Sequence, residues 1–158
     1  MPPPLLLDLE RVDLDQVLLT RDQIYEQLPH RHEFMLLDAV CHMDRDPLRL
    51  VAYADIRSDV WWVRGHVPGR PLLPGVLMLE MAAQASAVAA KTLVEHSGFI
   101  AFGGVEECRF RDTVVPGQRL YLICSGLDYR PRRIISRTQG VVDGKLVFEA
   151  TITGLTLR

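Results

Sequence analysis

The run from Val76 to about Val94 constrains this chain more than any other part of it. Leu, Met, Ala, Glu and Gln dominate the run, and these residue types favour the α-helix. Nearly every face of the expected helix is apolar, so the helix has to be enclosed by a curved sheet or by a sheet and a partner subunit. Because the run also contains Glu80, Gln84 and many alanines, it is only weakly hydrophobic, which indicates a buried core helix and no membrane span.

The rest of the chain predicts β-strands on both sides of this helix. The strand-type runs are Phe34–Cys41, Leu48–Ile56, Gly103–Phe110, Arg119–Tyr129, Arg133–Val142 and Lys145–Leu157. Asp143-Gly144, between the last two runs, is a strong hairpin turn. Thr20 and Gln23 form a capping box that opens a short helix, and Pro29 ends that helix. This order of elements predicts an α+β fold in which an antiparallel sheet wraps around one long central helix.

Length, charge and cysteine usage describe one near-neutral domain. The chain has 158 residues, with 18 Lys+Arg against 20 Asp+Glu and a formal net charge of −2. We expect a single domain over residues 1–158 and no nucleic-acid partner, because no global basic field is present. Residues 1–19 are an N-terminal extension to which the sequence assigns no role. Cys41, Cys108 and Cys124 lie far apart, and the N-terminus lacks a basic signal region, so we expect a reducing, cytoplasmic location.

Glu80 is the most informative residue, because it lies among apolar side chains on a helix that is buried on all sides. Desolvation raises the pKa of a carboxyl group, and a protonated Glu near neutral pH can act as a general acid. Gln84 lies four residues further on and shares the same helix face. The alternative is a structural Glu80 whose hydrogen bonds are satisfied by Gln84 or by backbone groups.

Two further features lie just before Glu80. His66 is held in a loop rich in proline and glycine, and histidine is the usual general base near pH 7. Pro74-Gly75-Val76 places free N–H groups and the positive end of the helix dipole where a carbonyl oxygen could bind. A base, an acid and an oxyanion donor thus come from one short segment.

Four colinear segments resemble the β-hydroxyacyl-acyl carrier protein dehydratases of fatty-acid synthesis. The first is the run from Gly65 to Ala85, with GHVPGRPLLPGVLMLEMAAQA, and the others are Leu28-Pro29-His30-Arg31, Val105–Arg111 and Asp143-Gly144-Lys145. A Glu at position 80 points to the FabZ type, since the related isomerising FabA type carries Asp there.

The resemblance implies a hot-dog fold and a homodimer, possibly a trimer of dimers, in which His66 of one subunit faces Glu80 of the other. It implies dehydration of (3R)-hydroxyacyl-acyl carrier protein to the trans-2-enoyl product. His66 would remove the C2 proton, Glu80 would donate to the leaving hydroxyl, and Gly75, Val76 and Gln84 would bind the substrate. No cofactor and no metal are implied.

Other interpretations stay open at this point. An acyl-thioesterase or an enoyl-CoA hydratase could use the same fold, and so could a non-catalytic acyl-binding protein. A patch for the acidic carrier protein could be formed by Arg109, Arg111, Arg132 and Arg133, although charged turns are usually only solvated. His30, His32 and His42 could suggest a metal, but no recognised ligand set with a Cys or a carboxylate is completed around them in the sequence.

Overall fold

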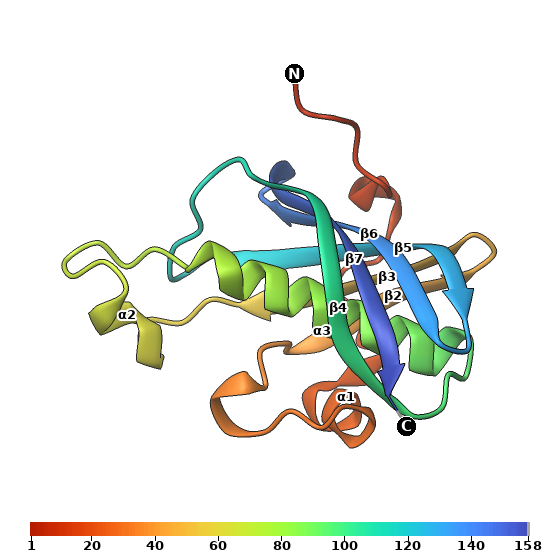
Figure 1. The fold of residues 1–158 in the computed structure, drawn as a ribbon. Helices are drawn as coiled ribbons and strands as arrows, with labels where there is room; N and C mark the ends of the chain where they lie inside the picture. Colours follow the sequence, from red (N-terminus) through yellow and green to blue (C-terminus); the bar gives the residue numbers. More distant parts are fainter. Residues whose placement is uncertain (158) are drawn as a thin grey trace.

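A curved antiparallel sheet of seven strands surrounds one long helix in the computed structural model, which describes residues 1–157 (Figure 1). The strand order is β1-β2-β3-β5-β6-β7-β4. In chain order the elements are the 3-10 helix η1 (Leu9–Arg11), β1 (Leu19–Thr20), α1 (Arg21–Gln27), the 3-10 helix η2 (His32–Phe34), β2 (Ala39–Arg45), β3 (Leu48–Asp55), α2 (Trp61–Gly65), α3 (Gly75–Leu93), β4 (Phe99–Phe110), β5 (Arg119–Arg130), β6 (Arg133–Val142) and β7 (Lys145–Leu157).

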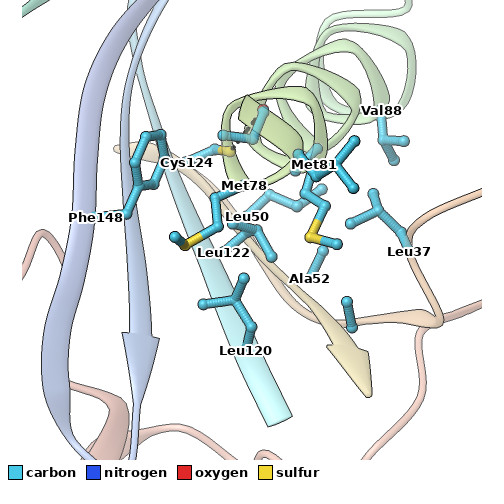
Figure 2. Packing of buried hydrophobic residues seen from close by; sticks show 14 of the residues in the cluster. Leu37, Leu50, Ala52, Met78, Met81, Val88, Leu120, Leu122, Cys124 and Phe148 are labelled. Atoms are coloured by element: carbon cyan, nitrogen blue, oxygen red, sulfur yellow. Dashed lines mark hydrogen bonds between the residues drawn. The ribbon is translucent and has the colours of Figure 1, made fainter. Parts of the chain in front are cut away.

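The predicted central helix is α3, and it contacts every strand from β2 to β7. Figure 2 shows Met78 and Met81 of α3 directed into a cluster with Leu50, Leu120 and Leu122 from the sheet. By length and composition α3 could cross a membrane, but 67% of its most apolar window is buried inside the fold. Enclosure by the sheet therefore explains its apolar composition.

The predicted C-terminal hairpin is confirmed with its boundaries. β6 and β7 pair from Arg133↔Leu155 to Val142↔Lys145. The turn residues Asp143 and Gly144 have φ values of 49° and 76°, and positive φ at both positions is what a tight two-residue hairpin turn requires. The capping box of Thr20 and Gln23 at the start of α1 is also confirmed.

Two of the predicted strands have wrong boundaries. The chain from Phe34 to Cys41 is not one strand: Phe34 ends η2, and β2 begins only at Ala39 and continues to Arg45. The backbone before Ala39 is held by a side chain, because Leu37 N–H donates to the Tyr25 hydroxyl at 2.8 Å. The strand predicted from Gly103 begins earlier, at Phe99, because its first residues pair with the end of β7.

The N-terminal extension lies along the outer face of the sheet. Four fully buried side chains of that face, Cys41, Val51, Ile123 and Val141, are covered by a set of partly buried N-terminal leucines, Leu5, Leu6, Leu7, Leu9 and Leu14. Gln139 fixes the extension at its start, since its amide oxygen accepts from Leu6 N–H at 2.7 Å and its amide nitrogen donates to the Pro4 carbonyl at 3.1 Å. Residues for which the sequence indicated no role therefore form a second, outer hydrophobic layer.

Candidate active site

Glu80 lies in the second turn of α3 at the wall of a cavity of about 210 Å³. Its side chain is 25% exposed. The walls are mostly apolar and come from α3, β4, β6, β7 and the loop after α1. The lining residues are His30, Glu80, Ala83, Gln84, Ser86, Ala87, Phe99, Ile100, Ala101, Phe102, Ile134, Ile152, Thr153 and Gly154. A single carboxylate in such a cavity is a candidate for acid–base chemistry on an apolar substrate.

Two side chains hydrogen-bond to the Glu80 carboxylate. Gln84 Nε2 donates to Glu80 Oε1 at 3.0 Å, as the shared helix face predicts. His30 Nε2 lies 3.3 Å from the same oxygen. Tyr25 extends the network, because its hydroxyl donates to Gln84 Oε1 at 2.6 Å. The carboxylate is therefore held by groups from the end of α1, the loop that follows it, and α3.

The expectation that burial keeps Glu80 protonated is wrong for this chain. Burial does oppose ionisation, but the hydrogen bonds from His30 and Gln84 outweigh it, and the pKa of Glu80 lies below its ordinary value. Glu80 is therefore a carboxylate near neutral pH, and the formal charge of −2 stands.

Gln84, which was expected to bind substrate, lines the cavity and is also engaged within the chain. Its side chain is 1% exposed, and its amide nitrogen donates to Glu80 and to the Phe34 carbonyl at 2.9 Å. Its amide oxygen accepts from Tyr25. Both ends of the amide are used inside the chain, so Gln84 supports Glu80, and substrate binding by Gln84 stays a prediction.

His66 follows α2 directly and is exposed in the single chain. Its Nδ1 lies 2.8 Å from the Leu72 carbonyl. A carbonyl oxygen can only accept, so Nδ1 carries the proton and Nε2 of the neutral ring is left as a free base. The loop between α2 and α3 thus sets the tautomer that general-base chemistry requires.

The first turn of α3 offers the expected backbone donors. Among residues 1–157, no acceptor pairs with the N–H groups of Gly75 and Val76, and Pro74 provides no side-chain cap. Gly75 is needed here for a reason that the sequence did not indicate. A Cβ at position 75 would lie 2.9 Å from the ring of Phe110, which stacks on Phe148.

The structure does not bring His66 and Glu80 together within one chain. Glu80 lines the cavity between α3 and the sheet, whereas His66 is absent from its lining and stands on the loop before α3. Each of the two groups has its own partners, Leu72 for His66 and His30 with Gln84 for Glu80.

The four candidate arginines do not form one patch. Arg109 pairs in register with Glu149 of β7, while Arg133 pairs with Leu155, about 20 Å further along the strand. Two of the four are already engaged in ion pairs, Arg111 with Glu149 at 2.8 Å and Arg133 with Asp128 at 3.0 Å.

His30 is the site residue that sequence reasoning did not assign to Glu80. It stands fifty residues before Glu80, so no helical or strand spacing connects them. The signal available was the resemblance of Leu28-Pro29-His30-Arg31 to the family's N-terminal motif. Within residues 1–157 no three His, Cys, Asp or Glu side chains gather as a possible metal site.

A sheet wrapped around a single long helix is the hot-dog fold, and solved structures share it. The dehydratase heterocomplex ApeI:P from Xenorhabdus doucetiae superposes with a TM-score of 0.73 at 16% identity, over 89% of this chain and 92% of the other. The TT0310 protein from Thermus thermophilus superposes with a TM-score of 0.60 at 23% identity, over 81% of this chain and all of the other. These likenesses define the fold class.

Sequence comparison defines the family within that class. The family model of the FabA-like domain matches residues 28–151. The 3-hydroxyacyl-[acyl-carrier-protein] dehydratase FabZ of Enterococcus faecalis is 40% identical over 136 residues, which is 85% of this chain and 96% of that protein. FabZ of Clostridium botulinum is 38% identical over 137 residues, with the same coverage. The chain belongs to the FabZ family of 3-hydroxyacyl-acyl carrier protein dehydratases.

Proposed function

We propose that this protein removes water from (3R)-hydroxyacyl chains on acyl carrier protein in fatty-acid biosynthesis, and that His66 and Glu80 carry out the proton transfers. The observation that carries the proposal is the Glu80 carboxylate at the wall of an apolar cavity, together with an imidazole whose Nε2 is free. The family supports the reaction and the carrier, since its curated relatives are named for them.

In the proposed reaction each of these groups has one role. The thioester carbonyl accepts a hydrogen bond from Gly75 N–H, with Val76 beside it in the first turn, which stabilises enolate character as the C2 proton leaves. Nε2 of His66 takes that proton. Protonated Glu80 gives its proton to the C3 hydroxyl, the C–O bond breaks, and water and the trans-2-enoyl thioester result. Hydration of the product runs the same steps backwards and starts from ionised Glu80 and protonated His66.

A homodimer would bring the two groups together. Among the strands of residues 1–157, β4 pairs with β7 alone and forms one edge of the sheet, so its other side offers backbone groups to a partner. The same strand exposes large apolar side chains, namely Phe99, Phe102, Val105 and Phe110. His66 is exposed and Glu80 lines a cavity beside β4, so each can meet the other group from a second chain. A trimer of such dimers is compatible with the same proposal.

The candidate carrier-binding arginines lie at opposite ends of α3. Phe110 contacts Gly75 at the N-terminal end of the helix, so its neighbours Arg109 and Arg111 lie at the end that holds the oxyanion donors. Arg132 lies at the far end, where its carbonyl accepts from Thr156 N–H near the start of β4. We therefore assign carrier binding to Arg109 and Arg111. We also place the protein in the cytoplasm, where acyl carrier protein would meet it.

The test is hydration of a crotonyl thioester, followed as loss of enoyl absorbance. The purified protein is expected to hydrate it, and His66→Ala or Glu80→Gln should lower turnover by roughly 10²–10⁴-fold while the fold is retained. His32→Asn, at an exposed histidine outside the site, is the matched control and should keep wild-type turnover.

The proposal fails if turnover on both carrier-protein and coenzyme A thioesters equals the buffer rate. It also fails if free thiol appears without any enoyl chemistry, because that outcome identifies a thioesterase. Faster turnover on the coenzyme A thioester than on the carrier-protein thioester would replace the dehydratase assignment by an enoyl-CoA hydratase.

A further inference from the structure

The two hydrogen bonds to Glu80 converge on one of its oxygens. His30 Nε2 and Gln84 Nε2 both lie near Oε1, at 3.3 and 3.0 Å. Within the described chain, residues 1–157, no hydrogen bond reaches Oε2. The carboxylate is thus held on one side and free on the other.

The direction of every hydrogen bond on the Gln84 side is fixed. Leu37 N–H can only donate, so the Tyr25 oxygen accepts from it at 2.8 Å and the Tyr25 hydroxyl proton points to Gln84 Oε1. Burial raises the pKa of Tyr25 to about 12, so the hydroxyl keeps that proton. The Gln84 amide therefore presents its nitrogen, a donor, to Glu80.

His30 is held in one orientation and one tautomer. Its ring meets the Tyr25 ring edge to face at 6.4 Å between centroids. Its Nδ1 is buried and has no hydrogen-bond partner among residues 1–157. A proton on Nδ1 alone would leave a buried N–H unpaired, so the proton that donates is assigned to Nε2, the atom that faces Glu80.

We propose that His30 is a positioning residue for Glu80: with Gln84 it fixes Oε1 by donated hydrogen bonds and leaves Oε2 as the oxygen that exchanges the working proton with the substrate. This inference rests on the proposed dehydratase function and adds the residue that makes its general acid, Glu80, more acidic. Donated hydrogen bonds stabilise the carboxylate that Glu80 becomes once it has given up its proton, which strengthens it as an acid.

Two other charged groups near this pair, Arg31 and Lys91, are engaged with backbone carbonyls. Glu26, Arg31 and Lys91 line a neighbouring cavity with His30. Arg31 donates to the carbonyls of Tyr25, Leu28 and His30, and Lys91 donates to the Gly98 carbonyl. The strands facing Glu80 contribute apolar residues, a glycine and Thr153 to its cavity and no titratable side chain. His30 is therefore the group whose removal should change the ionisation of Glu80.

The test is the pH profile of kcat/KM for crotonyl thioester hydration, which requires ionised Glu80. In His30→Leu the acidic limb should move to higher pH by roughly one unit, because the carboxylate loses a donor. His30→Gln places an amide donor near the position of Nε2 and should restore the wild-type limb. His32→Asn is again the matched control. An acidic limb that stays in place in His30→Leu, or a His30→Gln that behaves like His30→Leu, overturns the proposal.

A second measurement does not depend on turnover. With ¹³C-labelled glutamate side chains, the Glu80 carboxyl signal is assigned by its disappearance in Glu80→Gln. The signal is then titrated in the wild type, in His30→Gln and in His30→Leu. The wild type and His30→Gln should titrate at the same, lowered pH, and His30→Leu should titrate at higher pH. Identical titration in all three proteins overturns the positioning role, and the titration keeps its meaning even if the protein lacks hydratase activity.

Discussion

At the scale of single residues, the ionisation of Glu80 is set by its partners and not by burial alone. Burial alone would raise the pKa of the Glu80 carboxyl, but the hydrogen bonds from His30 and Gln84 reverse the balance and lower it. Glu80 is accordingly stable as a carboxylate, and its protonated form is the less populated, stronger acid. Because the pKa of Glu80 is lowered in the folded chain, its ionisation also affects the free energy of unfolding.

We predict that Glu80 stabilises the fold near neutral pH and ceases to do so in acid. Its folded pKa lies below its unfolded value, so the contribution is fully present above the unfolded pKa and is lost as pH falls through the folded pKa. The difference in unfolding free energy between wild type and Glu80→Gln should be up to about 1 kcal/mol near pH 7 and should be smaller near pH 3, below the unfolded pKa. Urea unfolding at both pH values measures it.

Glu10→Gln, at an exposed glutamate, is the matched control for loss of one charge. A wild-type advantage that grows as the pH falls would show that the folded pKa of Glu80 is raised, and would contradict the hydrogen-bond network described above.

Residues close in sequence could be predicted at this site, and residues distant in sequence could not. Gln84 was placed beside Glu80 because helical spacing puts them on one face. The free, basic Nε2 of His66 and the contact of His30 with Glu80 depend on folded loops, and no local pattern encodes them. The error about Glu80 protonation has the same origin, since burial was readable from α3 while the compensating donor His30 was not.

At the scale of elements, α3 and the hairpin of β6 and β7 follow from local sequence signals. Both are specified by residues within the element, through helix propensity in one case and by Asp143-Gly144 in the other. The segment before β2 was misassigned because its backbone is held by the hydroxyl of Tyr25, which comes from α1. The N-terminal extension was unreadable because its leucines are ordered only by the outer face of the sheet.

We predict that the extension contributes to stability through that outer face. Leu7→Ser should lower the unfolding free energy by about 1–2 kcal/mol, because it removes partly buried apolar surface from the N-terminal leucines that cover the outer face of the sheet. Val17→Ser, at a side chain that is 51% exposed, should change it by less than about 0.5 kcal/mol. Chemical denaturation of the two variants gives the comparison, and equal effects would mean that the extension does not pack as described.

At the scale of the whole molecule, the single chain carries the parts of a site and does not assemble them. His66 and Glu80 lie in separate surroundings, and the free edge of β4 with its exposed apolar side chains is where a second copy would complete the sheet. The proposed function therefore depends on a two-subunit arrangement in which each interface holds two sites related by symmetry.

Complementation between inactive subunits tests this account most directly. His66→Ala and Glu80→Gln chains carrying different tags are expressed together, and the mixed dimer is purified by both tags. If His66 of one subunit works with Glu80 of the other, each mixed dimer holds one intact site and should hydrate crotonyl thioester at about half the wild-type rate per dimer. A mixed dimer as inactive as either parent would contradict the account, because it would mean that the two groups do not act across the interface.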